Sequence, residues 1–251
     1  MNNKSQIIIA GHNSLARTIY EECNQLGVAN VDWNDFSRGK DTNVVIETEN
    51  SSREHKKQAI QEIETSVQAE ATILSTSLRM PATEIASWLN NSSRVIGFGA
   101  FSTINESGLV ELAPALQTDI FHLRSAETFF GYLGKEIEVV EDEVGLVFPR
   151  ILAMIINEAA FALTGKTADA HDIDVAMKKG TNYPYGPLEW AEKIGLEDVY
   201  AVLQGLFEQL GEDRYRPAPL IRKLIYAGWI GADVQKGFYY YQDRLKGEVM
   251  N

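Results

Sequence analysis

Short apolar runs alternate with amphipathic segments through the first half of the chain. Residues 6–10 form a run with three isoleucines that ends at Gly11-His12-Asn13, which is typical of a buried strand. Residues 15–26 place Ile19, Cys23 and Leu26 on one helical stripe, and Gly27 marks the end of that helix. The same reasoning predicts strands at residues 28–33, 43–47, 72–75, 95–98 and 136–140, and helices at 52–68, 82–89 and 126–133. Strands that alternate with helices predict a parallel, doubly wound sheet.

After residues 142–147 only helical periodicity remains. Pro149 stands where a helix start tolerates proline. Helices are predicted at residues 151–163, 170–179, 187–194, 196–210 and 218–227. We therefore expect two domains: an α/β domain at residues 1–143, with a shortened, Rossmann-like doubly wound parallel sheet, and an all-α domain at residues 144–251.

The charge balance and the single cysteine narrow the class of protein. The net charge is −12, which repels polyanions, so we expect no nucleic-acid partner, although one local basic group is enough to hold a small phosphate-bearing ligand. No apolar run approaches the roughly 20 residues of a membrane span, and no apolar core of a signal peptide follows the first residues. Cys23 is the single cysteine, which excludes a disulfide framework and a zinc site of cysteine pairs. We expect a cytoplasmic protein without membrane contact.

The turn after the first predicted strand reads Gly11-His12-Asn13-Ser14-Leu15-Ala16. A strand, a glycine turn and a helix present backbone N–H groups to the pyrophosphate of a dinucleotide. Gly11 matches the first glycine of Gly-x-Gly-x-x-Gly, and Ala16 is an accepted replacement for the third. Asn13 replaces the middle glycine and adds a side chain where the phosphates approach.

The ribose contact of such a site is less well defined. An acidic residue about 20 positions after the turn holds the ribose hydroxyls, and either Asn34 or Asp35 falls there. His12 would face a bound cofactor from within the turn. The alternative is a strand-to-helix turn that binds nothing.

Six motifs follow one another in order through the second half of the chain. They are Asn157-Glu158-Ala159, Asp172-Ile173-Asp174-Val175-Ala176-Met177, Gly180, Tyr183-Pro184-Tyr185-Gly186-Pro187, Arg214-Tyr215-Arg216-Pro217-Ala218-Pro219-Leu220 and Lys236-Gly237-Phe238-Tyr239. Together they resemble the C-terminal helical domain of the 3-hydroxyacyl-CoA dehydrogenase family. That domain helps to cover the active site in the family and forms its dimer interface, so the resemblance implies a homodimer through the helical domain.

The first half extends the resemblance. Val44-Val45-Ile46-Glu47 resembles the family's fourth strand, and Ile96-Gly97-Phe98 and Leu109-Val110-Glu111 resemble the strands that carry its catalytic pair. The resemblance implies an NAD cofactor and a small-molecule substrate of the acyl-CoA type. The positions that we expect to contact the cofactor are Gly11, His12, Asn13, Ala16, Asn34 and Glu47.

The resemblance also assigns the chemistry. Members oxidise a 3-hydroxyacyl-CoA by passing hydride to NAD while a histidine, oriented by a glutamate, takes the hydroxyl proton, and a serine and an asparagine hold the substrate oxygen. A base near neutral pH with a carboxylate that fixes its tautomer suits this reaction. By resemblance the glutamate is Glu111 and the serine is Ser75 or Ser77. The histidine position holds Gly99, and the asparagine position holds Pro149.

These two replacements mark a chemically altered member. Glycine accepts no proton and proline offers no side-chain hydrogen bond, and loss of a general base costs about 10²–10⁴-fold in rate. The sequence places none of the other histidines, His12, His55, His122 and His171, at the base position. Without its histidine, Glu111 has the alternative role of a solvated strand carboxylate.

The chain is also shortened. Only residues 34–42 separate the second and third predicted strands, where family members hold a helix, an arm that grips CoA and a further strand. Because a parallel crossover needs about a dozen residues or more, we infer that a strand–helix unit and the arm are deleted.

Two functions follow from these observations. The first is an NAD-linked oxidoreductase that acts on a 3-hydroxyacyl-CoA or a related β-hydroxy acid derivative with a rearranged site. The second is a non-catalytic dimeric family member that binds a nucleotide or acyl-CoA, or pairs with an active relative.

Overall fold

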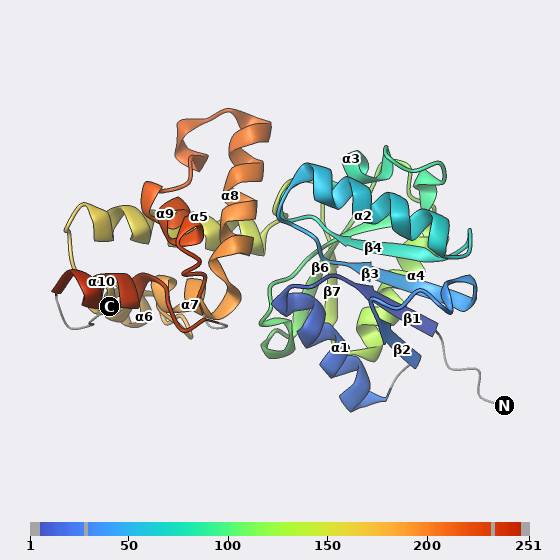
Figure 1. The fold of residues 1–251 in the computed structure, drawn as a ribbon, viewed down its shortest axis with the longest axis horizontal. Coiled ribbons are helices and arrows are strands. Elements are labelled where there is room, and N and C mark those ends of the chain that lie inside the picture. Colours follow the sequence, from blue (N-terminus) through green and yellow to red (C-terminus); the bar gives the residue numbers. More distant parts are fainter. Residues whose placement is uncertain (1–5, 28–29, 232–233, 247–251) are drawn as a thin grey trace. The chain divides into compact units, whose positions relative to one another are not determined.

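The computed structural model describes residues 6–27, 30–231 and 234–246, and Figure 1 draws it as a ribbon. The chain divides into two compact units, Met1–Phe148 and Pro149–Asn251. This division falls a few residues after the predicted boundary between residues 143 and 144. Each unit buries its own set of apolar side chains.

The first unit is built on one sheet. Within the described residues it has seven strands in the order β2-β1-β3-β4-β5-β6-β7. They are β1 Gln6–Ala10, β2 Asn30–Trp33, β3 Thr42–Glu47, β4 Thr72–Thr76, β5 Val95–Gly99, β6 Leu109–Pro114 and β7 Glu136–Val139. Neighbouring strands are parallel except for β5 and β6, which are antiparallel. The predicted doubly wound sheet is confirmed, and the reversal at β6 is a feature that the sequence did not predict.

Helices cover both faces of this sheet. One face carries α1 (Ser14–Leu26) and α4 (Ile120–Tyr132), and the other carries α2 (Arg53–Ser66) and α3 (Ala82–Ala86). Side chains alternate along β1 accordingly: Ile7 and Ile9 join the core of α1 and α4, whereas Ile8 joins the core of α2 and α3. A strand covered on both faces favours apolar side chains in both directions, which explains the three consecutive isoleucines of β1.

The connection from β2 to β3 is unusually short. β2 and β3 lie on opposite sides of β1, both parallel to it. Residues 34–41 make the whole crossover, with the single 3₁₀ turn η1 (Gly39–Asp41) in place of an α-helix. β2 lies at the edge of the described sheet, and the predicted short crossover is confirmed. Deletion of a strand–helix unit relative to the family stays a prediction.

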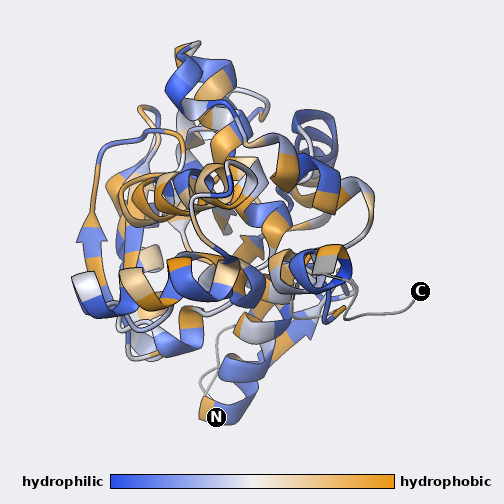
Figure 2. Ribbon diagram, turned by 90° about the vertical axis from the view of Figure 1, so that its left-hand side faces the viewer, coloured by the Kyte–Doolittle hydropathy of each residue, from blue (hydrophilic) through white to orange (hydrophobic). Residues whose placement is uncertain are grey.

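The second unit is helical, as predicted. Its helices are α5 Phe148–Thr164, which begins at the last residue of the first unit, α6 Ala170–Thr181, α7 Pro187–Ile194, α8 Leu196–Leu210, α9 Pro219–Tyr226 and α10 Phe238–Lys246. α6, α7 and α10 contact one another, and α8 contacts α7 and α9. Hydrophobic and hydrophilic residues alternate along the ribbons in Figure 2, as expected of helices with one buried and one solvated side.

Differences from the predicted elements lie mainly at helix ends. α4 begins at Ile120 rather than at residue 126, because the Asp119 side chain accepts the Phe121 N–H and caps an earlier first turn. α3 ends at Ala86, short of the predicted residue 89. α10 was not predicted, and it contains the three consecutive tyrosines Tyr239, Tyr240 and Tyr241. Pro149 lies in the first turn of α5, as predicted.

Candidate functional site

Strands β1, β3, β4 and β5 end at one edge of the sheet, which we call the carboxyl edge. The chain leaves β1 for β2 on one side and then reaches β3 on the other side of β1. Open α/β sheets bind ligands outside the carboxyl ends of their strands at such a switch point. Residues that follow β1, β2 and β3 are therefore the first candidates for cofactor contacts.

Gly11 joins β1 to α1 and has a φ of +154°. A Cβ at this position would overlap the hydroxyl of Thr48, the first residue after β3, so no larger residue fits. Ala16 is fully buried beside the turn, where a small side chain allows the close packing expected of the third fingerprint position. The backbone of the turn therefore has the geometry that the glycine fingerprint predicts.

Asn13 is the N-cap of α1. Its Oδ1 accepts the Ala16 N–H at 3.0 Å and the Thr48 hydroxyl at 2.9 Å, while its Nδ2 donates to the Thr48 carbonyl oxygen at 2.6 Å. The side chain thus occupies one of the N–H groups that a helix N-terminus offers to an anion.

Asn34 bonds the same turn from the end of β2. It has a left-handed backbone with a φ of +52°, which asparagine tolerates better than most residues. Its Oδ1 accepts the Gly11 N–H at 2.9 Å and its Nδ2 donates to the Gly11 carbonyl oxygen at 2.8 Å. The exposed ring of His12 lies next to it, with Nδ1 3.3 Å from the Asn34 Nδ2.

Asp35, the alternative ribose contact, has an exposed side chain. Its carboxylate accepts the Ser37 N–H at 2.9 Å, and this hydrogen bond lowers the pKa of Asp35. The carboxylate is therefore ionised and turned to its own loop.

These contacts test how well a dinucleotide fits. The strand, the glycine and the N-terminus of α1 provide the backbone cradle that a pyrophosphate needs. Asn13 and Asn34 satisfy part of that cradle from within the protein. The residues present therefore fit a dinucleotide whose pyrophosphate competes with the Asn13 carboxamide for the first turn of α1.

Strands β5 and β6 carry the positions at which the resemblance predicts the catalytic pair. The antiparallel register sets Gly99 directly opposite Glu111, at the carboxyl edge. Glu111 is 5% exposed, and its two carboxylate oxygens accept the Val147 and Phe148 N–H groups at 2.8 and 2.7 Å. Glu111 is therefore not a solvated strand carboxylate: it is buried and holds the start of α5, where a negative charge is favourable.

The histidines contribute no imidazole opposite Glu111. His122 is buried and bonded over 2.8 Å to Thr72, the first residue of β4, which places it at the opposite edge of the sheet. His55 lies in the first turn of α2, and its ring hydrogen-bonds the Ser51 hydroxyl. His171 is exposed on α6. His12 lies in the turn after β1, and its contact with a cofactor stays a prediction.

Comparison with known proteins accounts for both units. The NAD-binding domain of 3-hydroxyacyl-CoA dehydrogenases matches residues 15–143, and the C-terminal domain of the same enzymes matches residues 145–241. The chain belongs to the 3-hydroxyacyl-CoA dehydrogenase family. The first match begins at residue 15, so most of the turn that departs from the glycine fingerprint lies outside it.

Individual relatives cover most of the chain. A 3-hydroxybutyryl-CoA dehydrogenase of Bradyrhizobium diazoefficiens is 35% identical over 80% of this chain and 69% of its own length. A probable 3-hydroxybutyryl-CoA dehydrogenase of Deinococcus radiodurans is 32% identical over 84% of this chain and 74% of its own. The crystal structure of (S)-3-hydroxybutyryl-CoA dehydrogenase from Ralstonia eutropha has a TM-score of 0.77 and 26% identity, covering 94% of this chain and 98% of that one.

A buried polar network lies behind the carboxyl edge of this dehydrogenase-family sheet. The Lys56 ammonium, which is fully buried, donates to the Glu47 carboxylate at 2.8 Å, to the Glu49 carbonyl oxygen at 2.8 Å and to the Thr76 hydroxyl at 3.1 Å. The Ser75 hydroxyl donates to the same Glu47 oxygen at 2.5 Å. Glu47 and Ser75 are thus engaged inside the protein, and their predicted roles toward cofactor and substrate stay predictions.

Ser77 differs from Ser75. Its hydroxyl is buried, has no hydrogen-bond partner among the described residues, and lies against Gly97, where an added Cβ would overlap it. Its backbone ties β4 to the segment before α5, since the Gly145 N–H donates to the Ser77 carbonyl oxygen at 2.8 Å. A contact between this hydroxyl and a substrate oxygen stays a prediction.

The structure adds two residues to the site that the sequence did not single out. Thr48 lies against Gly11 and bonds Asn13, and Lys56 neutralises Glu47 from α2. A polar residue directly after a strand was a weak signal for Thr48. For Lys56 the sequence held no local signal, since a lysine on a polar helix is usually solvated.

The motifs of the helical unit have structural roles. Asp174 is 2% exposed and accepts the Leu188 and Glu189 N–H groups, both at 2.8 Å, at the start of α7. The Tyr239 hydroxyl donates to the same carboxylate at 2.6 Å, and burial together with this bond raises the pKa of Tyr239. A Cβ on Gly186 would overlap Asp174, which explains the glycine. These residues join α6, α7 and α10.

Asn157 plays a similar part on α5. Its carboxamide accepts the Ala218 N–H at 2.8 Å and donates to the Arg216 carbonyl oxygen at 3.1 Å. The segment that leads into α9 is thereby fixed to α5, so this motif too serves folding.

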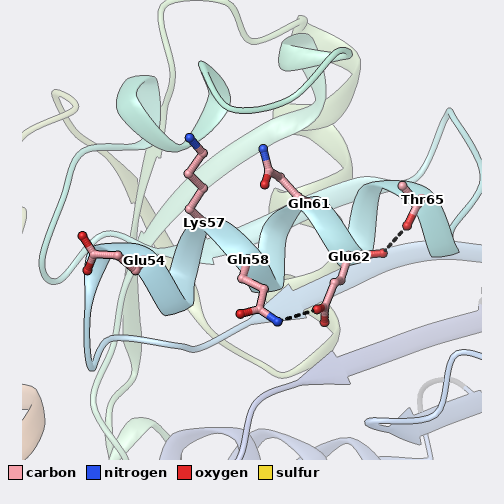
Figure 3. A pocket seen from close by; sticks show the side chains of 6 residues that line it. All are labelled: Glu54, Lys57, Gln58, Gln61, Glu62 and Thr65. Atoms are coloured by element: carbon pink, nitrogen blue, oxygen red, sulfur yellow. Dashed lines mark hydrogen bonds between the residues drawn. The ribbon is translucent and has the colours of Figure 1, made fainter.

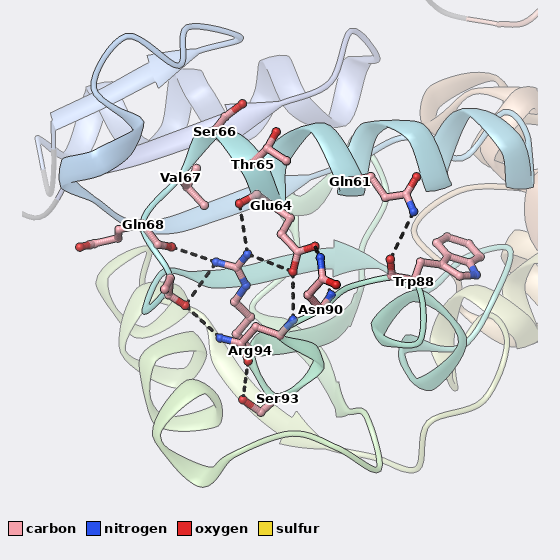
Figure 4. Close-up of polar contacts among 12 residues, drawn as sticks. Gln61, Glu64, Thr65, Ser66, Val67, Gln68, Trp88, Asn90, Ser93 and Arg94 are labelled. Carbon is pink, nitrogen blue, oxygen red and sulfur yellow. Dashed lines mark hydrogen bonds and ion pairs between the residues drawn. The ribbon is translucent and has the colours of Figure 1, made fainter.

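Two polar features lie elsewhere on the first unit. A hollow of about 440 Å³ on the outside of α2 is lined by one helix alone, with Glu54, Lys57, Gln58, Gln61, Glu62 and Thr65 side by side (Figure 3). The buried Arg94 donates to the Gln68 and Ala69 carbonyl oxygens and pairs with Glu64 at 3.6 Å, closing the C-terminal end of α2 (Figure 4). The side chains that line the hollow do not converge on one point, and the Arg94 contacts stabilise the end of α2. The carboxyl edge therefore stays the candidate site.

In the part of the chain that the structure describes, no helix is both long and apolar enough to cross a membrane.

Proposed function

We propose that the protein is an NAD-linked oxidoreductase that acts on a 3-hydroxyacyl-CoA or a related β-hydroxy acid derivative, at a rate limited by the lack of a base. The observation that carries this is the register of β5 and β6. In this register Glu111 lies at the carboxyl edge, where the Gly11 turn would also hold a dinucleotide. Gly99 lies directly opposite Glu111.

Cofactor binding and hydride transfer then each have a defined source, whereas proton transfer has no side-chain acceptor. Bound NAD⁺ supplies the hydride acceptor. Backbone N–H groups in the turn from Gly11 to Ala16 would hold its pyrophosphate. The hydroxyl proton has no side-chain acceptor at position 99, and both Glu111 oxygens already accept backbone N–H groups, so the proton would pass to solvent water. We therefore expect turnover about 10²–10⁴-fold below that of a site with the base in place.

The test is oxidation of 3-hydroxybutyryl-CoA by the full chain with NAD⁺, followed as NADH absorbance. Wild-type protein should form NADH slowly but above the buffer rate, and Gly99→His should be faster, with Gly99→Ala as the matched control that adds no base. Because Gly99 is buried, each variant needs a melting curve to show that it folds. A wild-type rate equal to that of buffer alone would remove the enzymatic function for this substrate.

A second function has its own support: a non-catalytic family member that binds a dinucleotide or an acyl-CoA, or pairs with an active relative. Gly99, Pro149 and the short crossover at residues 34–41 favour it, because they remove the base, the asparagine and the CoA-gripping arm together. Calorimetric titration with NAD⁺ and with acetyl-CoA separates the cases. Binding of either ligand without turnover supports this function, and binding of neither ligand rejects both ligand-based functions.

We also propose that the protein is a homodimer and that it is cytoplasmic. Ile151 and Phe161 on α5 are 54% and 36% exposed, an apolar surface that suits a homodimer through the helical unit. Light scattering should give the dimer mass, and Ile151→Glu should give the monomer mass. A reducing cytoplasm suits the one free cysteine, Cys23.

A further inference from the structure

The turn that would hold a pyrophosphate is closed from two sides by carboxamides. Asn13 bonds the Ala16 N–H, the Thr48 hydroxyl and the Thr48 carbonyl oxygen, at 3.0, 2.9 and 2.6 Å. Asn34 bonds the N–H and the carbonyl oxygen of Gly11 at 2.9 and 2.8 Å. We call Asn13, Asn34 and Thr48 the asparagine clasp.

We infer that the asparagine clasp, through Asn13, sets the affinity of the turn for a dinucleotide, because the clasp occupies a donor that the pyrophosphate needs. The inference rests on the proposed function, in which NAD(H) binds at this turn. Asn13 acts as an internal competitor: to bind a phosphate at the Ala16 N–H, the protein must first give up the bond from that N–H to the Asn13 Oδ1.

The local charge makes this competition decisive. Ser14, Leu15 and Ala16, the first three residues of α1, carry no charged side chain, and Arg17 follows them. Attraction for an anion at the Ala16 N–H therefore comes directly from that donor and from the helix dipole, with Arg17 one residue further along. The turn offers few N–H donors, and a hydrogen bond to a charged phosphate is stronger than one between neutral groups. Loss of one donor therefore has a large effect on the affinity for a dinucleotide.

Thr48 holds the competitor in place. It receives the Asn13 Nδ2 on its carbonyl oxygen and donates its hydroxyl to the Asn13 Oδ1. Gly11 has no Cβ, so the Thr48 hydroxyl can lie close to the turn. The clasp consists of residues that follow β1, β2 and β3. The same three strand ends form the switch point where a dinucleotide would lie.

The test is the dissociation constant for NADH, measured by calorimetry and by NADH fluorescence on the full chain. Asn13→Gly should bind NADH about tenfold to a hundredfold more tightly, the range of one hydrogen bond to a charged group. Thr48→Val should shift affinity in the same direction by less, since it removes only the hydroxyl. Asn13→Asp retains the cap but adds a negative charge, and should bind more weakly than wild type.

The matched control is Ser52→Gly. It removes the N-cap of α2, where the Ser52 hydroxyl accepts the His55 N–H at 3.1 Å, away from the clasp. Its melting temperature should fall as for Asn13→Gly, while its affinity for NADH stays at the wild-type value. An equal gain of affinity in Ser52→Gly would overturn the inference, because the effect would then come from helix fraying in general.

The remaining outcomes are also decisive. If wild type binds NADH and folded Asn13→Gly binds it no better, the clasp does not set affinity and the proposed function stands. If Asn13→Gly fails to fold, Thr48→Val decides: tighter binding supports the inference and unchanged binding overturns it. If neither wild type nor any folded variant binds NADH, both the inference and the proposed NAD-linked function fail.

Discussion

Replacement of Lys56 by methionine should destabilise the first unit strongly. Lys56 is 0% exposed and its partner Glu47 is 1% exposed in the side chain, so solvent does not screen their ion pair. Methionine keeps an unbranched apolar stem of similar length but removes the ammonium. Glu47 would then retain the Ser75 hydroxyl and the Glu49 N–H but lose the opposite charge.

The size of the loss follows from that burial. Removal of one partner from a buried ion pair costs about 3–5 kcal/mol, because the other charge stays buried without compensation. This is a large part of the roughly 5–15 kcal/mol that stabilises a typical protein. For a chain of this size it corresponds to a fall in melting temperature of roughly 6–20 °C. The double variant Lys56→Met with Glu47→Gln should lose much less than the sum of the two single losses.

The assay is urea denaturation followed by far-ultraviolet circular dichroism, with all variants under the same conditions. Arg124→Met is the matched control, since its ion pair with Glu127 has side chains 70% and 26% exposed. Exposed pairs contribute about 0–1 kcal/mol. A loss in Lys56→Met as small as that in Arg124→Met would show that the buried pair is not a source of stability, and the reasoning would be wrong.

Three further predictions concern single groups. Burial, helped by Glu22, raises the pKa of Cys23 to about 12, so the thiol should stay unreactive toward Ellman's reagent near pH 8 in the folded protein and react after unfolding; rapid labelling of folded protein would contradict this. Burial lowers the pKa of His122 below its usual 6.5, so the unfolded chain takes up the proton first and stability falls as pH drops from about 6.5 toward the folded-state value. His122→Gln should lose that component, and identical pH profiles of melting temperature would refute it. Asp174→Ala removes the carboxylate that accepts two α7 N–H groups and the Tyr239 hydroxyl, and should cost about 2–4 kcal/mol of helical-unit stability; denaturation unchanged from wild type would show that the carboxylate is replaceable.

The structure also changes how the lost chemistry is understood. Gly99 stands where the resemblance predicts the base, while Glu111 is buried and its two oxygens accept the N–H groups of Val147 and Phe148 at the start of α5. This carboxylate has a structural task that does not depend on a histidine opposite it. Its presence in the sequence therefore carries less weight for catalysis than the family resemblance alone implies.

Local patterns were sufficient for most of the fold. The unbroken apolar run at residues 6–10, the stripe through Ile19 and Cys23, and the proline at a helix start each predicted an element that the structure contains. The short stretch after Trp33 was sufficient to predict a crossover without an α-helix, since chain length limits what a crossover can contain.

What the sequence by itself determined is therefore the order of the elements, the two-unit organisation, the family and the absence of a base at position 99. What only the tertiary structure decided is which polar side chains meet: Asn13 with Thr48, Asn34 with Gly11, and Glu47 with Lys56. The physical reason is that apolar periodicity is a local signal, repeated within each element. A hydrogen bond between strand ends depends on sheet order and register, which residues far apart in the chain set together.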